Sequence, residues 1–445
     1  MKNFTRISLV LLAAALGSLS ISAQTCPNAD GCPDPSFNGT GSSVVPLPGG
    51  NGGLRDSIVL SDGKIIGLVD SSSTEIMLTE LNADGSLDTS FGTNGFVRTN
   101  WHFNSTLPRG YPYSLAIQHF ADGSEFVIVA GSWTVPTGRN TSSNYLRVDR
   151  YALDGQIDTT FGPDHTGTVI VNKSYGLAVA IQPDDQKIVT VGDLQAVVRL
   201  NANGSVDTSF GKNHDGTTGA GISGWSIIAL PVSNGGGILI GGSYANQSGE
   251  LLAVSKLKST GAVDSAFGTA GRATADFFGK GSFGRAFELV IDPDGKIVAG
   301  GIARRKGASV VQNQYAAARF LPGGQLDTSF SMDGRVTYDF NGLDNNGHGV
   351  AVQYDRKVIV TGTAQTASNA RDFAAVRFNS DGTVDTGFGS GGRVMSDLGG
   401  TSEYVYGTQI WTDPVCACEK LVIGGLTGGP VTSPAFLRYT TTGLY

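Results

Sequence analysis

Residues 199–216 read RLNANGSVDTSFGKNHDG, a segment in which Asn, Gly, Asp and Ser surround one phenylalanine, Phe210. The same phrase returns as ELNADGSLDTSFGTNG, RYALDGQIDTTFGPDH, RFLPGGQLDTSFSMDG and RFNSDGTVDTGFGSGG. A turn repeated at intervals of about 50–70 residues indicates a repeat architecture.

Each copy contains an Asp-x-x-Phe motif. The motif aspartates are Asp34, Asp88, Asp158, Asp207, Asp264, Asp327 and Asp385. The motif phenylalanines, in the same order, are Phe37, Phe91, Phe161, Phe210, Phe267, Phe330 and Phe388. We expect the motif to form the turn between the third and the outermost strand of each repeat, with the phenylalanine buried in the core.

Between the copies lie seven Gly-rich apolar segments: KIIGLVD, FVIVAGS, KIVTVGD, GILIGGS, KIVAGGI, KVIVTGT and KLVIGGL. An alternating strand precedes most of them, a third strand leads into the repeated phrase, and a fourth follows it. Four short strands per unit and no helical period are typical of an all-β, seven-bladed β-propeller of antiparallel blades. Glycines late in the second strand, such as Gly131, Gly192 and Gly362, fit positions where neighbouring backbones approach closely.

The phase of the repeat predicts how the ring closes. The first copy is followed only by a fourth strand, and the chain ends at AFLRYTTTGLY, which supplies only a third strand. We therefore expect residues 34–47 to pair with the strand near residues 435–439, which would complete the last blade and remove its free edges. Residues 34–445 would then form one propeller domain, preceded by a Cys-containing segment, residues 24–33.

The phrases AVRFNSDGTVDTGFG and ARFLPGGQLDTSF, together with the strand PDGKIVAGG, resemble the delta-60 repeat family of bacterial propeller-like proteins. The resemblance covers nearly the whole chain after residue 23. It implies the fold and export, and it implies no particular activity.

The N-terminal residues predict export. Lys2 and Arg6 precede an apolar run from Ile7 to Leu16, and small residues follow to Ala23, as in a secretory signal peptide spanning residues 1–23. We expect cleavage near Ala23 and a secreted or periplasmic monomer. No stretch reaches the roughly 18 apolar residues of a membrane span. The net charge of −7, without clustered Lys and Arg, argues against nucleic acid as a partner.

A charged residue stands eight positions before each motif aspartate from Asp88 onward, and again in the final, truncated copy. These residues are Glu80, Arg150, Arg199, Lys256, Arg319, Arg377 and Arg438. A cation at this place would face the motif carboxylate across the hairpin and fix the turn. Glu80 breaks the pattern in the first repeat.

A second acidic pattern lies twelve residues after the motif aspartate, at Asp276, Asp339 and Asp397, with Asn100 at the same offset in the first repeat. One interpretation is an Asx turn, in which the side chain accepts hydrogen bonds from the next backbone amides. The alternative is a ring of carboxylates that binds Ca²⁺, the one cofactor the sequence suggests.

The four cysteines are Cys26, Cys32, Cys416 and Cys418. An even number in an exported protein is consistent with disulfides. Both pairs should lie where the chain ends meet, and a Cys-x-Cys bridge closes a small, strained ring. We therefore expect at least one bridge between the N-terminal and the C-terminal pair, with two local bridges as the alternative.

Function is predicted only as a class. HExxH and GxSxG motifs are absent, and GKGSFG (279–284) precedes a strand rather than a helix, so no catalytic residue is assigned. Unequal loop lengths instead favour a binding propeller whose long-loop face recognises an extracellular or envelope carbohydrate, peptide or surface polymer. The candidate ligand residues are Trp101, His102, Tyr111, Tyr113, Trp133, Arg139, Arg304, Arg305 and Arg371. The alternative is a hydrolase or lyase with an acid-based site at the mouth of the central channel.

Overall fold

The computed structural model describes residues 30–71, 75–102, 109–138, 141–172, 176–192, 196–247, 249–305, 312–366, 370–429 and 431–444. In these ranges the regular structure is β-strand, apart from the short 3-10 helix η2 (Val232–Asn234). No helix in the described ranges has the length and apolar character needed to cross a membrane.

The first half of the chain forms β1 (Ser42–Val44), β2 (Gly52–Val59), β3 (Ile65–Ser71), β4 (Glu75–Leu81), β5 (Phe96–His102), β6 (Arg109–His119), β7 (Glu125–Gly138), β8 (Thr141–Ala152), β9 (Thr168–Asn172), β10 (Ala178–Ile181), β11 (Ile188–Val191), β12 (Ala196–Leu200), β13 (Thr217–Gly219) and β14 (Ser223–Ala229). The second half forms β15 (Ile238–Asn246), β16 (Gly249–Leu257), β17 (Arg272–Ala275), β18 (Ser282–Ile291), β19 (Ile297–Arg304), β20 (Gln314–Phe320), β21 (Arg335–Tyr338), β22 (Asn345–Val352), β23 (Val358–Gln365), β24 (Arg371–Phe378), β25 (Arg393–Ser396), β26 (Ser402–Asp413), β27 (Cys418–Gly428) and β28 (Ser433–Leu444).

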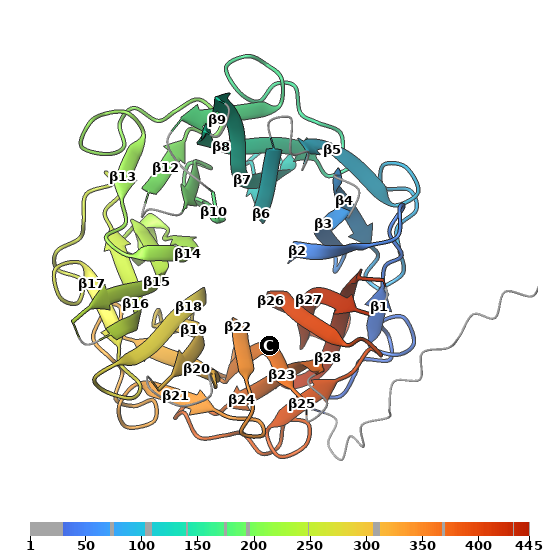
Figure 1. Ribbon diagram of the computed structural model, residues 1–445, viewed down its shortest axis with the longest axis vertical. Coiled ribbons are helices and arrows are strands. Elements are labelled where there is room, and N and C mark those ends of the chain that lie inside the picture. The colour runs from blue at the N-terminus through green and yellow to red at the C-terminus, as the bar shows by residue number, and fades with distance from the viewer. Residues whose placement is uncertain are drawn as a thin grey trace, which may run out of the picture.

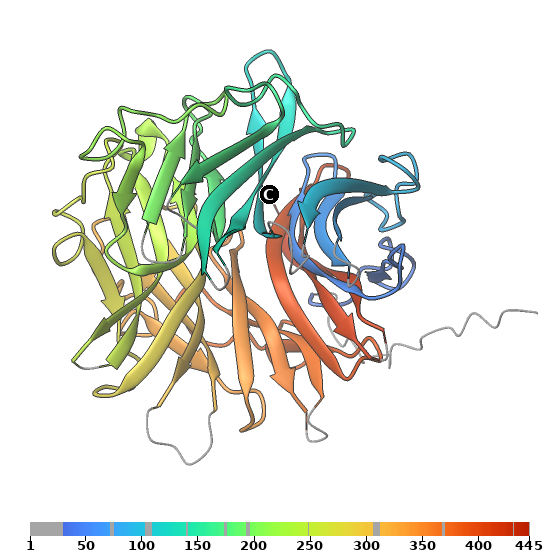
Figure 2. The ribbon, with the colours of Figure 1, turned by 45° about the horizontal axis from the view of Figure 1, so that its top comes forward.

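Hydrogen bonds join these strands into five sheets of four strands and one sheet of eight. The larger sheet consists of two four-stranded antiparallel units, β14–β17 and β18–β21, which meet where β16 pairs in parallel with β18. The units stand radially, with β2, β6, β10, β14, β18, β22 and β26 nearest the common axis (Figure 1). Figure 2 shows the twisted sheets side by side around that axis.

The two ends of the described chain share one sheet, in the order β1-β28-β27-β26. Strand β1 pairs antiparallel with β28 through Ser42↔Leu437, Ser43↔Phe436 and Val44↔Ala435. Residues 42–44 of the predicted segment 34–47 therefore pair with residues 435–437, within the predicted partner strand.

The hydrophobic core is divided among the interfaces between neighbouring units. The second strand of each unit is packed on both faces, so consecutive residues are buried, as in β11, where all four are buried, rather than alternate ones. One cluster joins Leu54 and Val69 of the first unit to Val422 and Phe436 of the last. The first and the last unit are therefore linked by side-chain packing in addition to the β1–β28 strand pairing.

The phenylalanine of every motif is buried in this core, as the repeat predicts. The exposed fraction is at most 3 % for each of Phe37, Phe91, Phe161, Phe210, Phe267, Phe330 and Phe388. Each ring belongs to a different hydrophobic cluster of the described chain. The repeated turn therefore supplies one aromatic side chain to every interface between units.

The repeated phrase also forms a polar clasp between neighbouring units. In the copy at residues 199–216, Arg199 Nε donates to Asp207 Oδ2 at 2.7 Å. The guanidinium carbon of Arg199 lies 4.3 Å from the ring centroid of Phe210. Arg199 Nη1 also donates to the carbonyl of Ser259 in the next unit, at 2.5 Å. The predicted cation–aspartate pair is confirmed here, and it is buried rather than exposed.

Four other copies share the stacked arginine of this clasp. The guanidinium carbon lies 4.6–4.7 Å from the ring centroid in the pairs Arg150 with Phe161, Arg319 with Phe330, Arg377 with Phe388, and Arg438 with Phe37. The copy that contains Phe267 has Lys256 in place of arginine, and its Nζ lies 3.7 Å from Asp264 Oδ2. Arginine therefore provides both the ion pair and the stacking, whereas lysine provides a longer ion pair.

In the first repeat, which contains Phe91, the cation comes from Lys64, which immediately precedes β3. Lys64 Nζ lies 2.8 Å from Glu80 Oε1 and 2.8 Å from Asp88 Oδ2. Glu80 is 4 % exposed, and burial raises its pKa despite the bond to Lys64. One lysine, just before the second strand, therefore pairs with two carboxylates in this repeat.

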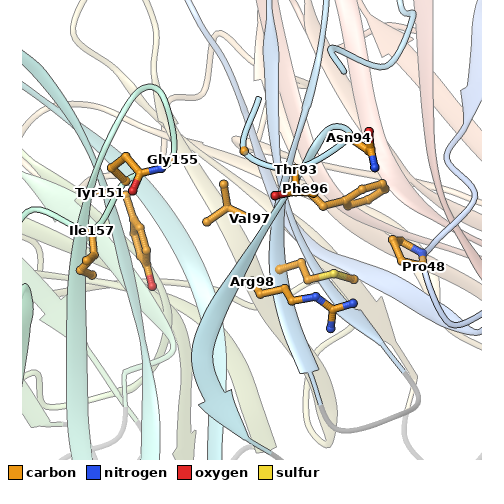
Figure 3. A pocket seen from close by; sticks show the side chains of 12 residues that line it. Pro48, Thr93, Asn94, Phe96, Val97, Arg98, Tyr151, Gly155 and Ile157 are labelled. Carbon is orange, nitrogen blue, oxygen red and sulfur yellow. The ribbon is translucent and has the colours of Figure 1, made fainter. Parts of the chain in front are cut away.

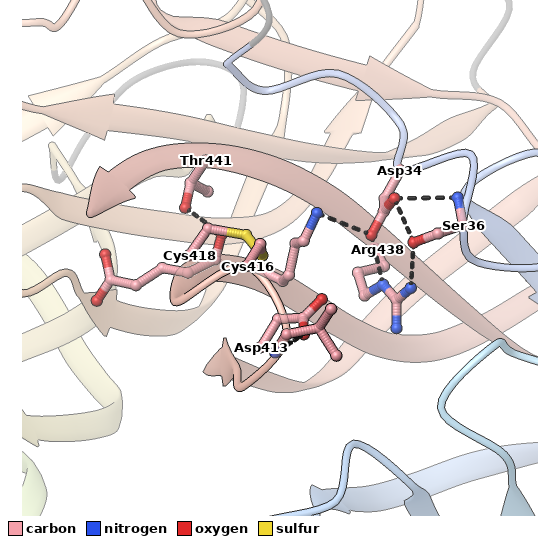
Figure 4. Close-up of a disulfide and its surroundings, with 10 residues drawn as sticks. Asp34, Ser36, Asp413, Cys416, Cys418, Arg438 and Thr441 are labelled. Carbon is pink, nitrogen blue, oxygen red and sulfur yellow. Dashed lines mark hydrogen bonds and ion pairs between the residues drawn. A yellow bond between two sulfur atoms is a disulfide. The ribbon is translucent and has the colours of Figure 1, made fainter. Parts of the chain in front are cut away.

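The predicted bridge between the N-terminal and C-terminal cysteines is wrong. Cys416 and Cys418 are bonded to each other across the β26–β27 turn (Figure 4), with their Cα atoms 5.1 Å apart. Ala417 between them has a φ of 50°, and this left-handed residue folds the chain back so that its neighbours reach bonding range. Cys32 is also disulfide-bonded, whereas Cys26 lies outside the described residues.

Candidate functional site

Six innermost strands contain a β-bulge at the same point of the repeat. A bulge inserts one extra residue into a strand and re-aims its side chain. The extra residues are Arg55, Tyr113, Trp225, Phe287, His348 and Tyr406. These six side chains, together with Leu177 just before β10, line one cavity on the axis, with a volume of about 480 Å³.

Glycine in the second strand makes room for the bulge. A Cβ atom at Gly131 would lie 2.2 Å from the carbonyl oxygen of Tyr111, and one at Gly362 would lie 2.0 Å from that of Asn346. Both contacts are closer than real Cβ atoms permit, so a larger residue would push the bulged strand away. The predicted close backbone approach at these two glycines is confirmed, and its consequence is the shape of the cavity.

The bulged side chains of four consecutive units form a continuous aromatic arc. Trp225 meets Phe287 edge-on with ring centroids 5.8 Å apart, and Phe287 stacks on His348 at 5.4 Å with planes 7° apart. His348 in turn meets Tyr406 at 5.8 Å. Burial lowers the pKa of His348 to about 4, so at neutral pH its imidazole is an uncharged member of the arc.

Two carboxyl groups follow the bulges directly. Asp56 Oδ2 accepts the backbone N–H of Leu115 at 2.7 Å, and Glu288 Oε2 accepts that of Val350 at 2.8 Å. Both line the cavity yet are surrounded by protein, so desolvation raises the pKa of Asp56 to about 7 and that of Glu288 to about 8. The charge of Asp56 contributes to the rise at Glu288.

Serine occupies the equivalent position in two other units. Ser114 Oγ accepts the N–H of Val179 at 3.3 Å, and Ser226 Oγ accepts that of Leu289 at 3.1 Å. The hydrogen bond between neighbouring innermost strands therefore requires only a short polar side chain. The ionisable carboxyl groups of Asp56 and Glu288 are therefore not required for this hydrogen bond.

The channel continues beyond the aromatic cavity. A second hollow of about 460 Å³ is lined mainly by aliphatic side chains of β2, β18, β22 and β26. Glu288, Leu289 and Gln409 line both spaces. Glu288 therefore stands where the aromatic and the aliphatic parts of the channel meet.

The charged side chains nearest the cavity are already paired. Arg55 Nε donates to Asp70 Oδ2 at 2.7 Å. Arg285, whose guanidinium carbon lies 5.0 Å from the ring centroid of Trp225, donates to Glu250 Oε1 at 2.7 Å. Among the described residues, no cation forms an ion pair with Asp56 or Glu288.

Trp101 and Trp133, predicted to contact ligand, instead pack between the first two units. Trp101 is fully buried, and its ring lies edge-on to that of Trp133 at 6.1 Å. The guanidinium carbon of Arg147 lies 4.5 Å from one indole and 4.8 Å from the other, and Arg147 is paired with buried Asp149. The prediction fails for Trp101 because strand β5 extends farther than expected and turns that side chain into the core.

The other predicted ligand residues are dispersed. Tyr113 lines the cavity and stacks on Tyr111 at 6.5 Å. Arg304 and Arg305 cover the rings of Phe283 and Phe278, and Arg371 pairs with Asp344 at 2.8 Å. Arg139 and most of the long loops lie outside the described residues, as does the side chain of His102. Of the predicted set, only Tyr113 is placed in the central cavity by the described part of the chain.

The three aspartates considered for Ca²⁺ form Asx turns. Asp276 Oδ1 accepts the N–H of Gly279 at 2.8 Å, Asp339 Oδ1 that of Gly342 at 2.7 Å, and Asp397 Oδ1 that of Gly399 at 2.6 Å. In the described ranges, the only group of three His, Cys, Asp or Glu ligands within 4.8 Å of one another is Asp413, Cys416 and Cys418. The three aspartates are thus not gathered into one cation site.

A further hollow of about 520 Å³ is lined mainly by residues of the first two units (Figure 3). It is lined by Phe96, Val97 and Arg98 of β5 and by Tyr151 and Ile157 of the next unit. Among the described residues that line it, Arg98 alone is charged. Most of this lining belongs to the repeated turn and its neighbours, so the hollow follows from how the repeats pack.

One family model matches the repeats of this chain. The family model described as "Domain of unknown function (DUF5122) beta-propeller" matches residues 60–91, 182–210, 293–330 and 353–388, so these four stretches are similar to β-propeller repeats. No curated protein matches. The solved "Crystal structure of WD40 beta propeller domain of Doa1" is similar with a TM-score of 0.48 and 10 % identity, covering 89 % of this chain and 97 % of that chain.

Proposed function

We propose that this chain is an exported, seven-bladed propeller, closed by β1, that binds a small ligand in its central cavity. Four-stranded units, the β1–β28 pairing and the core shared by the first and last units support the count and the closure. The leader-like residues 1–23 and the Cys416–Cys418 disulfide support export.

The observation that carries the proposal is the convergence of bulged residues from six units on one cavity. Bulges recur beside functional sites because they re-aim side chains. A volume of about 480 Å³ lies within the range of small-molecule sites, which are commonly aromatic with a few polar groups. The cavity replaces the long-loop surface as the proposed binding site.

A screen for stabilising ligands tests this proposal. A ligand that binds only the folded state raises the melting temperature. Phe287→Ala and Tyr406→Ala should abolish the effect of ligands found with the unmodified protein, whereas Arg305→Ala, on the exposed surface, should leave it unchanged. Ligands whose effect survives both cavity substitutions and disappears in Arg305→Ala would contradict the proposal.

The second candidate is a hydrolase or lyase, favoured by the two carboxyl groups with raised pKa values. A carboxyl group with a pKa near 8, such as Glu288, is protonated at neutral pH and can act as a general acid. Chemical change of a bound ligand, lost in Glu288→Gln with binding retained, would favour this candidate over a binding protein.

A further inference from the structure

We infer that the ligand of the central cavity carries an organic cation, an ammonium or guanidinium group, held by Asp56, Glu288 and the aromatic arc. This inference rests on the proposed function and names the chemistry of its ligand. It follows from the position of the two carboxyl groups, from the lack of an ion pair between either of them and a cation among the described residues, and from the aromatic lining.

The first step concerns the carboxyl groups themselves. The backbone amides of Leu115 and Val350 need an acceptor, and serine provides one at the equivalent places in other units. A carboxyl group there carries the additional penalty of desolvation. Residues that break a local rule in this way are typical of functional sites.

The second step concerns charge balance. In the described part of the chain, Arg55 and Arg285 are engaged by Asp70 and Glu250, and no cation pairs with Asp56 or Glu288. When ionised, the two acids would leave uncompensated negative charge inside the channel. A positively charged ligand would supply the missing partner, and its charge would favour the ionised form of both groups.

The third step concerns the walls. Trp225, Phe287 and Tyr406 present π-systems to the same space, and cations are attracted to the faces of such rings. His348 is uncharged at neutral pH because burial holds its pKa near 4, so it does not repel a cation.

The size of the site favours an organic ion over a metal ion. Asp56, Glu288 and His348 line the same cavity, but in the described chain they do not form a group with ligand atoms within 4.8 Å of one another. Carboxylates spread around a cavity of about 480 Å³ match a cation with its own volume. The aliphatic hollow beyond Glu288 would take an apolar part of the same ligand.

Three probes of similar size and different charge test the inference on the full chain: benzyltrimethylammonium, benzyl alcohol and phenylacetate. Calorimetric titration at pH 8 should show the cation binding at least tenfold more tightly than the neutral probe, with the anion weakest. Glu288→Gln and Asp56→Asn, which keep an acceptor for the backbone amide, should each weaken cation binding about tenfold and leave benzyl alcohol unaffected.

A pH series on the unmodified protein gives a second measurement that needs no variant. The probe cation does not titrate, and it favours ionised carboxylates. Its affinity should therefore rise between pH 6 and 9 as the protons of Asp56 and Glu288 become easier to displace. The other ionisable side chains that line the cavity are Arg55, Tyr113, His348 and Tyr406. His348, with a pKa of about 4, titrates below this pH window.

The outcomes separate this inference from the proposed function. Equal or tighter binding of benzyl alcohol or phenylacetate, lost in Phe287→Ala, would overturn the cationic ligand and retain the cavity as a binding site. Cation affinity that ignores pH and both carboxamide variants would also overturn the inference. Ligands from the stabilisation screen that act independently of Phe287 and Tyr406 would instead overturn the proposed function itself.

Discussion

Arg438 and Asp34 join the two ends of the chain, with Arg438 Nε 2.8 Å from Asp34 Oδ2 across 404 residues of sequence. Figure 4 shows this pair, in which Arg438 belongs to β28. Arg438 also donates to the carbonyl of Ala83 at 2.5 Å and lies over the ring of Phe37 at 4.7 Å. The contacts reproduce those of Arg199 within one continuous repeat, so the clasp between the ends has the geometry of an internal one.

Replacing Arg438 by Met should destabilise the whole protein. It leaves the Asp34 carboxylate, 2 % exposed, with Lys420 at 3.3 Å as its nearest cation, and breaking a buried pair costs about 3–5 kcal/mol. Arg199→Met is the matched control, because it removes the same contacts from a pair eight residues apart. Urea unfolding followed by circular dichroism should show similar decreases in unfolding free energy for the two variants. A neutral Arg438→Met beside a costly Arg199→Met would show that the Arg438–Asp34 contact does not contribute to stability.

Lys64 should become dispensable once Glu80 is changed to arginine. Lys64→Gln leaves Glu80 and Asp88 as neighbouring carboxyl groups without their shared cation, and a loss of about 1–3 kcal/mol is expected. Glu80→Arg in the same protein would restore the arginine–aspartate pair of the other repeats, stack on Phe91 and recover most of that stability. The unfolding free energies of Lys64→Gln and of the double variant Lys64→Gln/Glu80→Arg check this. A double variant that is less stable than Lys64→Gln would contradict the prediction.

The sequence was sufficient for features that recur in every repeat and insufficient for those formed between repeats. The motif aspartates, the buried phenylalanines and the closely approached Gly131 all follow from local rules. The bulges escaped prediction because an inserted residue shifts the alternation of a strand by one position. One signal was available: Trp225, Phe287 and His348 each stand two residues before an apolar segment that continues the innermost strand. These side chains come from units about 60 residues apart, and the sequence repeat alone does not show that they meet in space.

Trp101 should prove structural rather than ligand-binding. Its indole is fully buried between the first two units, against Trp133 and Arg147. Trp101→Ala should therefore lower the unfolding free energy by about 3–5 kcal/mol, and Trp101→Phe by less. Binding of the cavity probes should be unchanged under conditions where the variant remains folded. A stable Trp101→Ala protein with impaired binding would restore the long-loop surface as the site.

Glu288 should make the protein less stable as the pH rises, and Glu288→Gln should remove the contribution of this residue to that dependence. Burial raises the pKa of Glu288 from 4.5 to about 8 in the folded protein. The unfolded chain therefore loses this proton at a lower pH than the folded chain does. Because the folded state holds more protons between about pH 4.5 and 8, its stability falls across that window and levels off above it.

The glutamine variant keeps an acceptor for the Val350 amide without the titration. The unfolding free energy of the variant, relative to that of the unmodified protein, should increase by about 2–4 kcal/mol between pH 5 and pH 8. This figure is reduced from the full pKa shift because the Glu288 side chain is partly exposed to the cavity. Ser226→Ala, which alters the equivalent bond to Leu289 without a titrating group, should show a difference that stays constant with pH. Chemical unfolding at pH 5, 6, 7, 8 and 9 measures both. A Glu288→Gln difference that is flat or falls with pH would mean that this carboxyl group is ionised in the folded protein, and the channel would then hold its negative charge without a ligand.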